Sequence, residues 1–453
     1  AVTAEWLNQA KYPGSTINEA WKRFIYHQFH DDLTGTSIPR AYEFSWNDEL
    51  ISLKQFSNVL TSSIHGIGRE LDTRVSGIPV ILYNALGFAV TDIAEIELDL
   101  PKAPKGITVY DEKGKKVSAQ LISYTDGKAR ILVEATVPAT GYVVYDVRTS
   151  GTGASNVSTN VNTLENSLYK ITLDKNGDIV SLTDKKNGKE LVKAGKAIRL
   201  ALFTQNKSYN WPAWEVLKET TDRTPVSITD DVKITLVEDG TLRKSLCVEK
   251  RHGESVFRQY IRLYEGSRAE RIDFYNEIDW QSTNALLKAE FPLNIENEKA
   301  TYDLGIGSIQ RGNNTETAYE VYAQYWADLT DHDGSYGVSV MNDSKYGWDK
   351  PDNHTIRLTL LHTPETRGGY AYQDHQDLGH HTFTYSLIPH QGALDKPATV
   401  EKAEKLNQQL KAFRTEKHKG NAGKSFSFVA SDNRNVLIKA LKKAEETDEY
   451  VVR

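Results

Sequence analysis

The sequence contains almost no sulfur. Its 453 residues include one cysteine, Cys247, and one methionine, Met341. A single cysteine excludes an intramolecular disulfide framework and any metal site built from several thiolates. It does not decide the compartment, so the cytoplasm and the bacterial periplasm both stay open.

The sequence also lacks an excess of positive charge. It carries 55 basic and 61 acidic residues, for a formal net charge of −6. A chain of this balance has no broad electropositive surface, so neither nucleic acid nor a membrane is expected as a partner. The apolar run at residues 78–90 is too short to span a bilayer and contains Asn84 and Gly87. No transmembrane segment or signal peptide is predicted.

Three common catalytic signatures are missing as well. The sequence has no G-x-x-x-x-G-K-[ST] loop, no H-E-x-x-H helix and no G-x-S-x-G elbow. Nucleotide binding, zinc-protease chemistry and serine hydrolysis of those types therefore have no support.

The first part of the chain has helical periodicity. Residues 15–30 place apolar side chains at three- and four-residue steps, and Thr16 and Glu19 have capping-box spacing. Residues 46–71 keep the same steps for about seven turns. The two predicted helices form an antiparallel hairpin joined through TGTSIPR. The apolar positions of the second helix are Leu50, Leu53, Phe56, Leu60, Ile64, Ile67 and Leu71.

After residue 73 the period changes from 3.6 to 2, which indicates strands separated by turns. We predict a mainly β protein with an N-terminal α-helical hairpin or bundle segment at residues 1–73. A small β domain follows at 74–150, and a large antiparallel β-super-sandwich at 151–453. Residues 149–160 have the Ser, Thr, Gly and Asn composition of a linker.

The two ends of the chain suggest an interior piece of a larger protein. The first residues are Ala-Val-Thr-Ala rather than an initiator methionine. The last five residues, EYVVR at 449–453, read as the start of a strand with no partner or cap after it. We therefore expect the sandwich to be truncated at its end.

The stretch YHQFHDDLTGT, residues 26–36, concentrates two histidines and two aspartates. Its residue types allow a metal site, an acid/base pair or a polar helix end. Taken alone, a histidine at a helix end is more often a surface or capping residue than a ligand.

The same stretch resembles a segment of glycoside hydrolase family 38, the zinc-dependent α-mannosidases. The similarity lies in QFHD at 28–31 followed by TGT at 34–36. Five later stretches resemble the all-β C-terminal region of that family, in the same order. They are LLKAEFPL (286–293), YWADLTD (325–331), MNDSKYGWD (341–349), LTLLHTP (358–364) and DLGHHTFTYSLIPH (377–390).

The resemblance implies a role for two residues of the motif. It makes His30 the fourth ligand of a zinc ion whose other three ligands lie on an N-terminal α/β barrel. Asp31 would bind hydroxyls of the mannose in the −1 subsite. Zinc accepts imidazole and carboxylate ligands, and one metal can chelate the cis O2 and O3 of mannose.

The resemblance also implies what this chain does not contain. Retaining hydrolysis needs a nucleophile and a general acid/base, which the family places on the barrel. We therefore expect no catalytic residue in this chain, no binding of zinc or of another divalent cation in its place without the barrel, and little activity from the chain alone. Its expected partners are mannose-containing glycans and the barrel of the same protein, and self-association stays open.

Weaker candidates lie in the sandwich. Trp211 and Trp214 are predicted to stack on sugar rings, although buried sandwich aromatics are the favoured alternative. Arg311 fits an interdomain or glycan contact as well as an ordinary surface salt bridge. His375 and Asp377 copy the look of a metal-ligand pair, but we interpret them as structural residues of a strand.

Three other residues receive structural interpretations. His27 is expected to pack or to form hydrogen bonds, and Asp32 to accept hydrogen bonds in the turn. His362 stands where the family often has arginine, which puts an arginine-based contact there in doubt.

The predicted function is to form part of an α-mannosidase that hydrolyses terminal α-mannosidic bonds with retention. The alternative is a non-catalytic carbohydrate-binding or structural sandwich.

Overall fold

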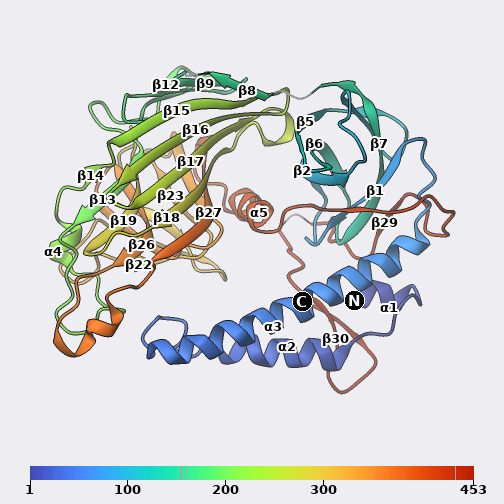
Figure 1. The fold of residues 1–453 in the computed structure, drawn as a ribbon, viewed down its shortest axis with the longest axis horizontal. Helices are drawn as coiled ribbons and strands as arrows, with labels where there is room; N and C mark the ends of the chain where they lie inside the picture. Colours follow the sequence, from blue (N-terminus) through green and yellow to red (C-terminus); the bar gives the residue numbers. More distant parts are fainter. Residues whose placement is uncertain (154–155, 160, 434) are drawn as a thin grey trace. The chain divides into compact units, whose positions relative to one another are not determined.

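The computed structural model describes residues 1–153, 156–159, 161–433 and 435–453 (Figure 1). The chain divides into two compact units. The first comprises Ala1–Ala154 together with Gln408–Arg453, and the second comprises Ser155–Asn407. The described residues are mainly in antiparallel strands, with the longest helices at the N-terminal end, so the predicted fold class is confirmed.

Three helices begin the first unit. They are α1 (Val2–Trp6), α2 (Gly14–Tyr26) and α3 (Pro39–Glu70). Helices α2 and α3 lie side by side as the predicted hairpin (Figure 1). The predicted capping box is wrong, because Thr16 lies inside a helix that starts at Gly14 without a side-chain cap. Helix α3 starts at Pro39 rather than at residue 46, since proline suits the first helical position.

The small β domain of the first unit contains two sheets. One has the strand order β28-β1-β7-β3-β4, with β29 also pairing with β7, and the other has the order β2-β6-β5. Their facing apolar residues, such as Val80, Val133 and Val143, form one core. The strands are β1 (Ile78–Asn84), β2 (Val90–Asp99), β3 (Ile107–Tyr110), β4 (Lys116–Val117), β5 (Ala119–Thr125), β6 (Lys128–Val137), β7 (Gly141–Thr152), β28 (Lys411–Arg414) and β29 (Ser425–Ser427).

The last part of the chain returns to this first unit. Strand β28 pairs with β1, and β29 pairs with β7. The sequence analysis assigned residues 408–453 to the sandwich, because local periodicity does not reveal pairing with a strand far away in the sequence. The expected strand in EYVVR is β31 (Tyr450–Val452), which pairs with the preceding strand β30 (Leu441–Lys443).

The second unit is a large antiparallel sandwich. Its sheets have the orders β21-β20-β23-β24-β27-β18-β17-β16-β15-β8, β14-β13-β19-β26-β25-β22 and β12-β11-β10-β9. One continuous core contains Leu287, Phe291 and Ile356 from the six-stranded sheet together with Phe274 and Leu387 from the ten-stranded sheet. Alternate residues of these strands therefore point into the core, as the two-residue period predicts.

The strands of this unit differ widely in length. They are β8 (Asn156–Thr159), β9 (Thr163–Glu165), β10 (Tyr169–Leu173), β11 (Ile179–Asp184), β12 (Lys189–Glu190), β13 (Arg199–Thr204), β14 (Val226–Ser227), β15 (Asp230–Asp239), β16 (Arg243–His252), β17 (Ser255–Tyr264), β18 (Ile272–Trp280), β19 (Ala285–Pro292), β20 (Ala300–Asp303), β21 (Ser308–Arg311), β22 (Val321–Tyr322), β23 (Trp326–Thr330), β24 (Tyr336–Asn342), β25 (Gly347–Asp352), β26 (Thr355–Thr363) and β27 (Gly379–Gln391).

Short helices connect some of these strands. They are α4 (Lys218–Thr221), α5 (Lys396–Asn407), and the 3-10 helices η1 (Gly266–Arg268) and η2 (Gly368–Gln373). In the predicted linker at 149–160, strand β7 continues to Thr152, and positions 154, 155 and 160 lie outside the described residues. Among the helices that the structure describes, none combines the length and the apolar composition of a membrane span.

Candidate functional site

The motif residues His30 and Asp31 lie in the turn between α2 and α3. The side chain of His30 is 77% exposed, and its Nε2 lies 3.4 Å from Oδ2 of Asp31. Asp31 is 41% exposed and accepts a hydrogen bond of 3.2 Å from the Thr36 hydroxyl. Both side chains are therefore accessible, and neither is enclosed in a pocket of the first unit.

His27 occupies a different environment in the same turn. Its side chain is only 5% exposed, and Nδ1 lies 2.6 Å from Oδ2 of Asp32. Nε2 lies 3.4 Å from Oδ2 of Asp48 on α3. Burial alone would lower the pKa of His27, but the hydrogen bonds with Asp32 and Asp48 outweigh it and raise the pKa. The expected packing and hydrogen-bonding environment of His27 is thus found in the structure.

The motif by itself does not complete a metal site. Within the part of the chain that the structure describes, no three histidine, cysteine, aspartate or glutamate side chains are grouped so that they could hold a metal ion. His30 fits the role of a single imidazole ligand, because its ring is exposed and makes no short hydrogen bond. A structural zinc site needs about four protein ligands, so most would have to come from elsewhere.

The hairpin that carries the motif exposes an unusual amount of apolar surface. Helix α3 buries Ile64 and Ile67, and Leu71 directly after it is also buried. The same helix leaves Leu50 and Leu53 more than 60% exposed. Isolated exposed apolar residues are common, whereas a contiguous group marks an interaction surface. The exposed members of α2, the turn and α3 are Trp21, Phe24, Ile25, Tyr26, Phe29, Leu33, Ile38, Phe44, Trp46, Leu50, Ile51, Leu53 and Leu60.

The second unit carries an exposed aromatic group, which we call the aromatic loops. Trp211 and Trp214 are 50% and 57% exposed, so the favoured interpretation that they are buried is wrong. The ring centroid of Trp211 lies 5.7 Å from that of Trp214 and 5.5 Å from that of Tyr370. Tyr372 lies 6.4 Å from Tyr370 and is also exposed. The sequence analysis missed both tyrosines, because only the fold brings the segment 368–373 beside the segment 208–215.

Partly buried polar side chains hold the aromatic loops in place. Glu215 accepts hydrogen bonds of 2.7 Å from the Ser208 hydroxyl and from the backbone N–H of Tyr209. The buried imidazole of His362 lies 3.3 Å from the carbonyl oxygen of Pro212. Burial lowers the pKa of His362, so its neutral form is favoured. His362 therefore acts as a structural support beneath the loop.

The remaining candidates have local structural roles. Arg311 donates a hydrogen bond of 2.6 Å to the carbonyl oxygen of Tyr322, and its guanidinium lies 5.3 Å from the ring centroid of Tyr302. We expected Asp377 to lie in a strand, but it lies outside β27, which begins only at Gly379. It has a φ of 57° and accepts a hydrogen bond of 2.7 Å from the backbone N–H of His362.

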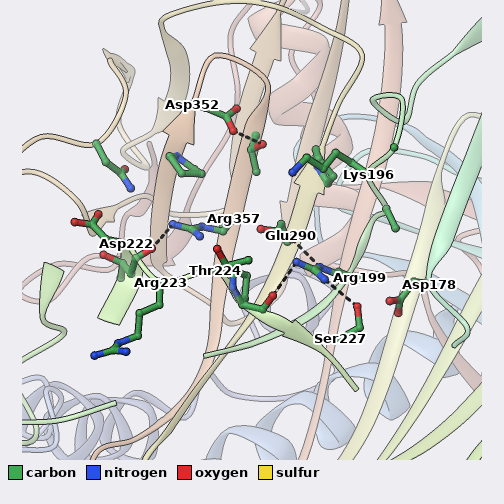
Figure 2. Close-up of a pocket in the computed structure, with 18 of the residues that line it drawn as sticks. Asp178, Lys196, Arg199, Asp222, Arg223, Thr224, Ser227, Glu290, Asp352 and Arg357 are labelled. Carbon is green, nitrogen blue, oxygen red and sulfur yellow. Dashed lines mark hydrogen bonds and ion pairs between the residues drawn. The ribbon is translucent and has the colours of Figure 1, made fainter. Parts of the chain in front are cut away.

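A polar pocket of about 930 Å³ lies against the six-stranded sheet of the second unit (Figure 2). A row of alternating charge crosses four strands here, from Arg199 to Glu290, Arg357 and Asp349. Arg199 pairs with Glu290 at 2.8 Å, and Arg357 and Lys288 both pair with Asp349. Because these charges already neutralise one another, the row provides no free pair of carboxylates for glycoside hydrolysis.

Comparison with known proteins identifies most of the second unit. Residues 164–366 match the profile of the glycosyl hydrolases family 38 C-terminal domain. Alpha-mannosidase G of Dictyostelium discoideum is 25% identical over 494 aligned positions, covering 98% of this chain and 43% of that protein. Alpha-mannosidase 2C1 of Mus musculus is 25% identical, covering 89% of this chain and 36% of that protein.

A solved structure shares the fold of nearly the whole chain. The alpha-mannosidase of Enterococcus faecalis superposes with a TM-score of 0.79 at 17% identity, covering 98% of this chain and 58% of that one. This likeness supports the fold and no finer property. The chain spans less than half the length of the two curated relatives above.

Proposed function

Since this chain belongs to glycosyl hydrolase family 38, we propose that it forms part of an α-mannosidase that removes terminal mannose with retention of configuration. In this proposal His30 supplies one zinc ligand, and Asp31 binds hydroxyls of the mannose whose bond is cleaved. The nucleophile and the general acid/base, about 5–5.5 Å apart in retaining enzymes, come from another part of the protein.

One observation carries the proposal. The two motif residues are exposed next to each other in the turn between α2 and α3, and both helices carry exposed apolar side chains. Such a surface suits docking against another folded part, which would bury the apolar side chains and enclose His30 and Asp31. A catalytic barrel of the same protein is the proposed occupant, because the related mannosidases are more than twice as long as the region they share with this chain.

The two motif side chains have distinct tasks in this arrangement. A bound zinc ion would supply a Lewis acid for neighbouring hydroxyls of the mannose ring and would favour distortion toward an oxocarbenium-like state. The exposed imidazole of His30 would be one of its ligands. The carboxylate of Asp31 accepts hydrogen bonds from sugar hydroxyls and orients the ring.

The aromatic loops are the second proposed contact with substrate. Exposed indole and phenol rings pack well against the C–H faces of pyranose rings. Trp211, Trp214 and Tyr370 form such a surface within one unit, held by Glu215 and His362. We propose that it binds sugar units of the glycan, and Arg311 is a weaker candidate for the same role.

The test is hydrolysis of an aryl α-mannoside by the full-length protein, compared with its His30→Ala variant and with this chain alone. We expect activity in the full-length protein, its loss on treatment with a chelator, and its return on adding zinc. His30→Ala should remove the activity and the bound zinc. His65→Ala, an exposed histidine on the same helical hairpin, should leave both unchanged.

A second function is favoured by the exposed aromatic loops. A carbohydrate-binding sandwich without chemistry would bind mannosides through Trp211 and Trp214 and would need neither zinc nor His30. An inactive full-length protein that still binds mannose oligosaccharides, and loses this binding with Trp211→Ala, would put this alternative in place of the mannosidase.

A further inference from the structure

We propose that His27 is a positioning residue, which bridges Asp32 and Asp48 and thereby fixes the turn that presents His30 and Asp31. This inference rests on the proposed function only for the roles of His30 and Asp31 in binding metal and sugar. The bridge itself is a feature of the hairpin tip.

The bridge encloses the motif within the sequence. His27 is the first residue after α2, and its Nδ1 contacts Oδ2 of Asp32 at 2.6 Å. His30 and Asp31 lie between these two residues in the sequence, so the contact between the side chains of His27 and Asp32 closes a short backbone loop that contains them. Closing a short loop removes much of its conformational freedom. The backbone directions of the two motif residues are therefore restricted before any ligand binds.

The same imidazole connects this closed turn to α3. Its second nitrogen lies 3.4 Å from Oδ2 of Asp48. Ser45, one helical turn before Asp48, donates to both carboxylate oxygens of Asp32, at 3.0 and 2.9 Å. The end of α2, the turn and the first turns of α3 are thus joined through one buried ring.

Further hydrogen bonds support the outer part of the turn. The Thr34 hydroxyl donates to the carbonyl oxygen of His30, and the Thr36 hydroxyl contacts Asp31. The Tyr42 hydroxyl lies 3.3 Å from the carbonyl oxygen of Asp31 and accepts a hydrogen bond from the backbone N–H of Ser37. These contacts leave the side chain of His30 pointing outward with 77% exposure.

The bridge needs a ring with two donors. Each ring nitrogen faces a carboxylate, so the doubly protonated imidazolium satisfies both contacts, whereas the neutral ring donates to only one. The other groups near the bridge are Arg23, 3.8 Å from Asp48, the ring of Tyr26 against His27, and Tyr42 beside Asp32. Arg23 has the same sign of charge as the imidazolium, but the two cations share the carboxylate of Asp48, which compensates both. Raising the pH should therefore weaken the bridge and loosen the turn.

The first experiment uses this chain and does not depend on enzyme activity. Amide hydrogen exchange of residues 31–36 is measured between pH 6 and pH 9 for the native chain, His27→Gln and Asp48→Asn. Each rate is converted to a protection factor by comparison with the intrinsic, base-catalysed rate of an unprotected amide at the same pH. We expect His27→Gln to lower the protection factors in the turn about tenfold at pH 6 and to remove their pH dependence. Asp48→Asn should have a smaller effect, since it breaks only one contact. His65→Gln on α3, which lies outside the bridge, is the matched control.

The second experiment uses the full-length protein. Supporting residues of a metal site typically change metal affinity or activity 10- to 100-fold when they are replaced. His27→Gln should weaken zinc binding or lower kcat/KM by about that factor, with the thermal unfolding midpoint of the sandwich unchanged.

Two results would overturn the positioning role. One is a set of protection factors in His27→Gln with the same values and pH dependence as in His65→Gln. The other is faster exchange with unchanged zinc affinity and kcat/KM, because the bridge would then have no consequence for His30. If the native full-length protein neither binds zinc nor hydrolyses mannosides, the proposed function fails, and the exchange data still decide whether His27 holds the turn.

Discussion

The hairpin tip and the sandwich treat their charged and apolar groups in opposite ways. In the sandwich, Lys288 and Asp349 are fully buried and paired with each other at 2.8 Å. At the tip, His30 is 77% exposed, and apolar side chains such as Leu50 face solvent. The sandwich pairs these buried charges within its own core. The tip leaves its groups available, which is what a surface that completes a site with another part of the protein requires.

The largest expected effect breaks the ion network of the sandwich. Asp349→Asn leaves Lys288 and Arg357 buried with one carboxylate fewer between them, so both cations lose compensation. Breaking a buried pair costs about 3–5 kcal/mol of the free energy of unfolding. Urea unfolding followed by tryptophan fluorescence measures this. Lys128→Met, which removes an exposed pair with Glu97, should leave the unfolding midpoint in place.

Acid should destabilise the sandwich through Asp273. Burial alone would raise the pKa of this carboxyl, but the Arg271 guanidinium at 2.7 Å outweighs it and lowers the pKa from 3.8 to about 2. Since the folded pKa is depressed, the stabilisation is present above about pH 4 and is lost as the pH falls toward 2. The lowering corresponds to about 2 kcal/mol. Unfolding midpoints between pH 5 and pH 2 should show this decrease, and Asp273→Asn should show less of it.

Alkali should act on the hairpin tip instead. The pKa of His27 is raised above its ordinary value of 6.5, so its contribution is fully present below about pH 6.5 and is lost as the pH rises through the folded pKa. An NMR titration that follows the chemical shifts of the His27 ring protons against pH measures that pKa directly. A tip that keeps its order up to pH 9 while the ring deprotonates would contradict the comparison of the two regions.

The smallest effect concerns the exposed face of α3. Leu50 is 67% exposed, so Leu50→Gln should change the free energy of unfolding of this chain by about 0.5 kcal/mol or less. The matched change Ile64→Gln, in the buried half of the same helix, should be strongly destabilising. Sedimentation of both variants would also show whether the exposed face mediates self-association, which Leu50→Gln should reduce.

Much of the fold could be predicted from local patterns. The step of three and four residues in Leu50, Leu53 and Leu60 correctly indicated a helix, although only its later part is buried. The alternation after residue 73 correctly indicated strands. The pattern could not show which strands pair, so the return of Lys411–Arg414 to β1 was missed. Such pairs cannot be predicted from periodicity, because the two-residue period of a strand is the same whichever strand it pairs with.

The candidate site was predictable only in part, for a similar reason. The motif placed His30 and Asp31 on a helix end, and the structure locates them in the turn after α2. Their roles in metal and sugar binding stay predictions. The exposure of Trp211 and its contact with Tyr370 were not readable, because two loops meet only after the sheet beneath them has formed.

The sequence by itself determined the fold class, the helical hairpin and the family resemblance, since periodicity and motifs are properties of consecutive residues. The tertiary structure alone decided that His27 is buried between Asp32 and Asp48 while His30, three residues later, is exposed. Two histidines of the same turn differ because burial and hydrogen-bond partners depend on what packs against each ring, and no local pattern encodes that.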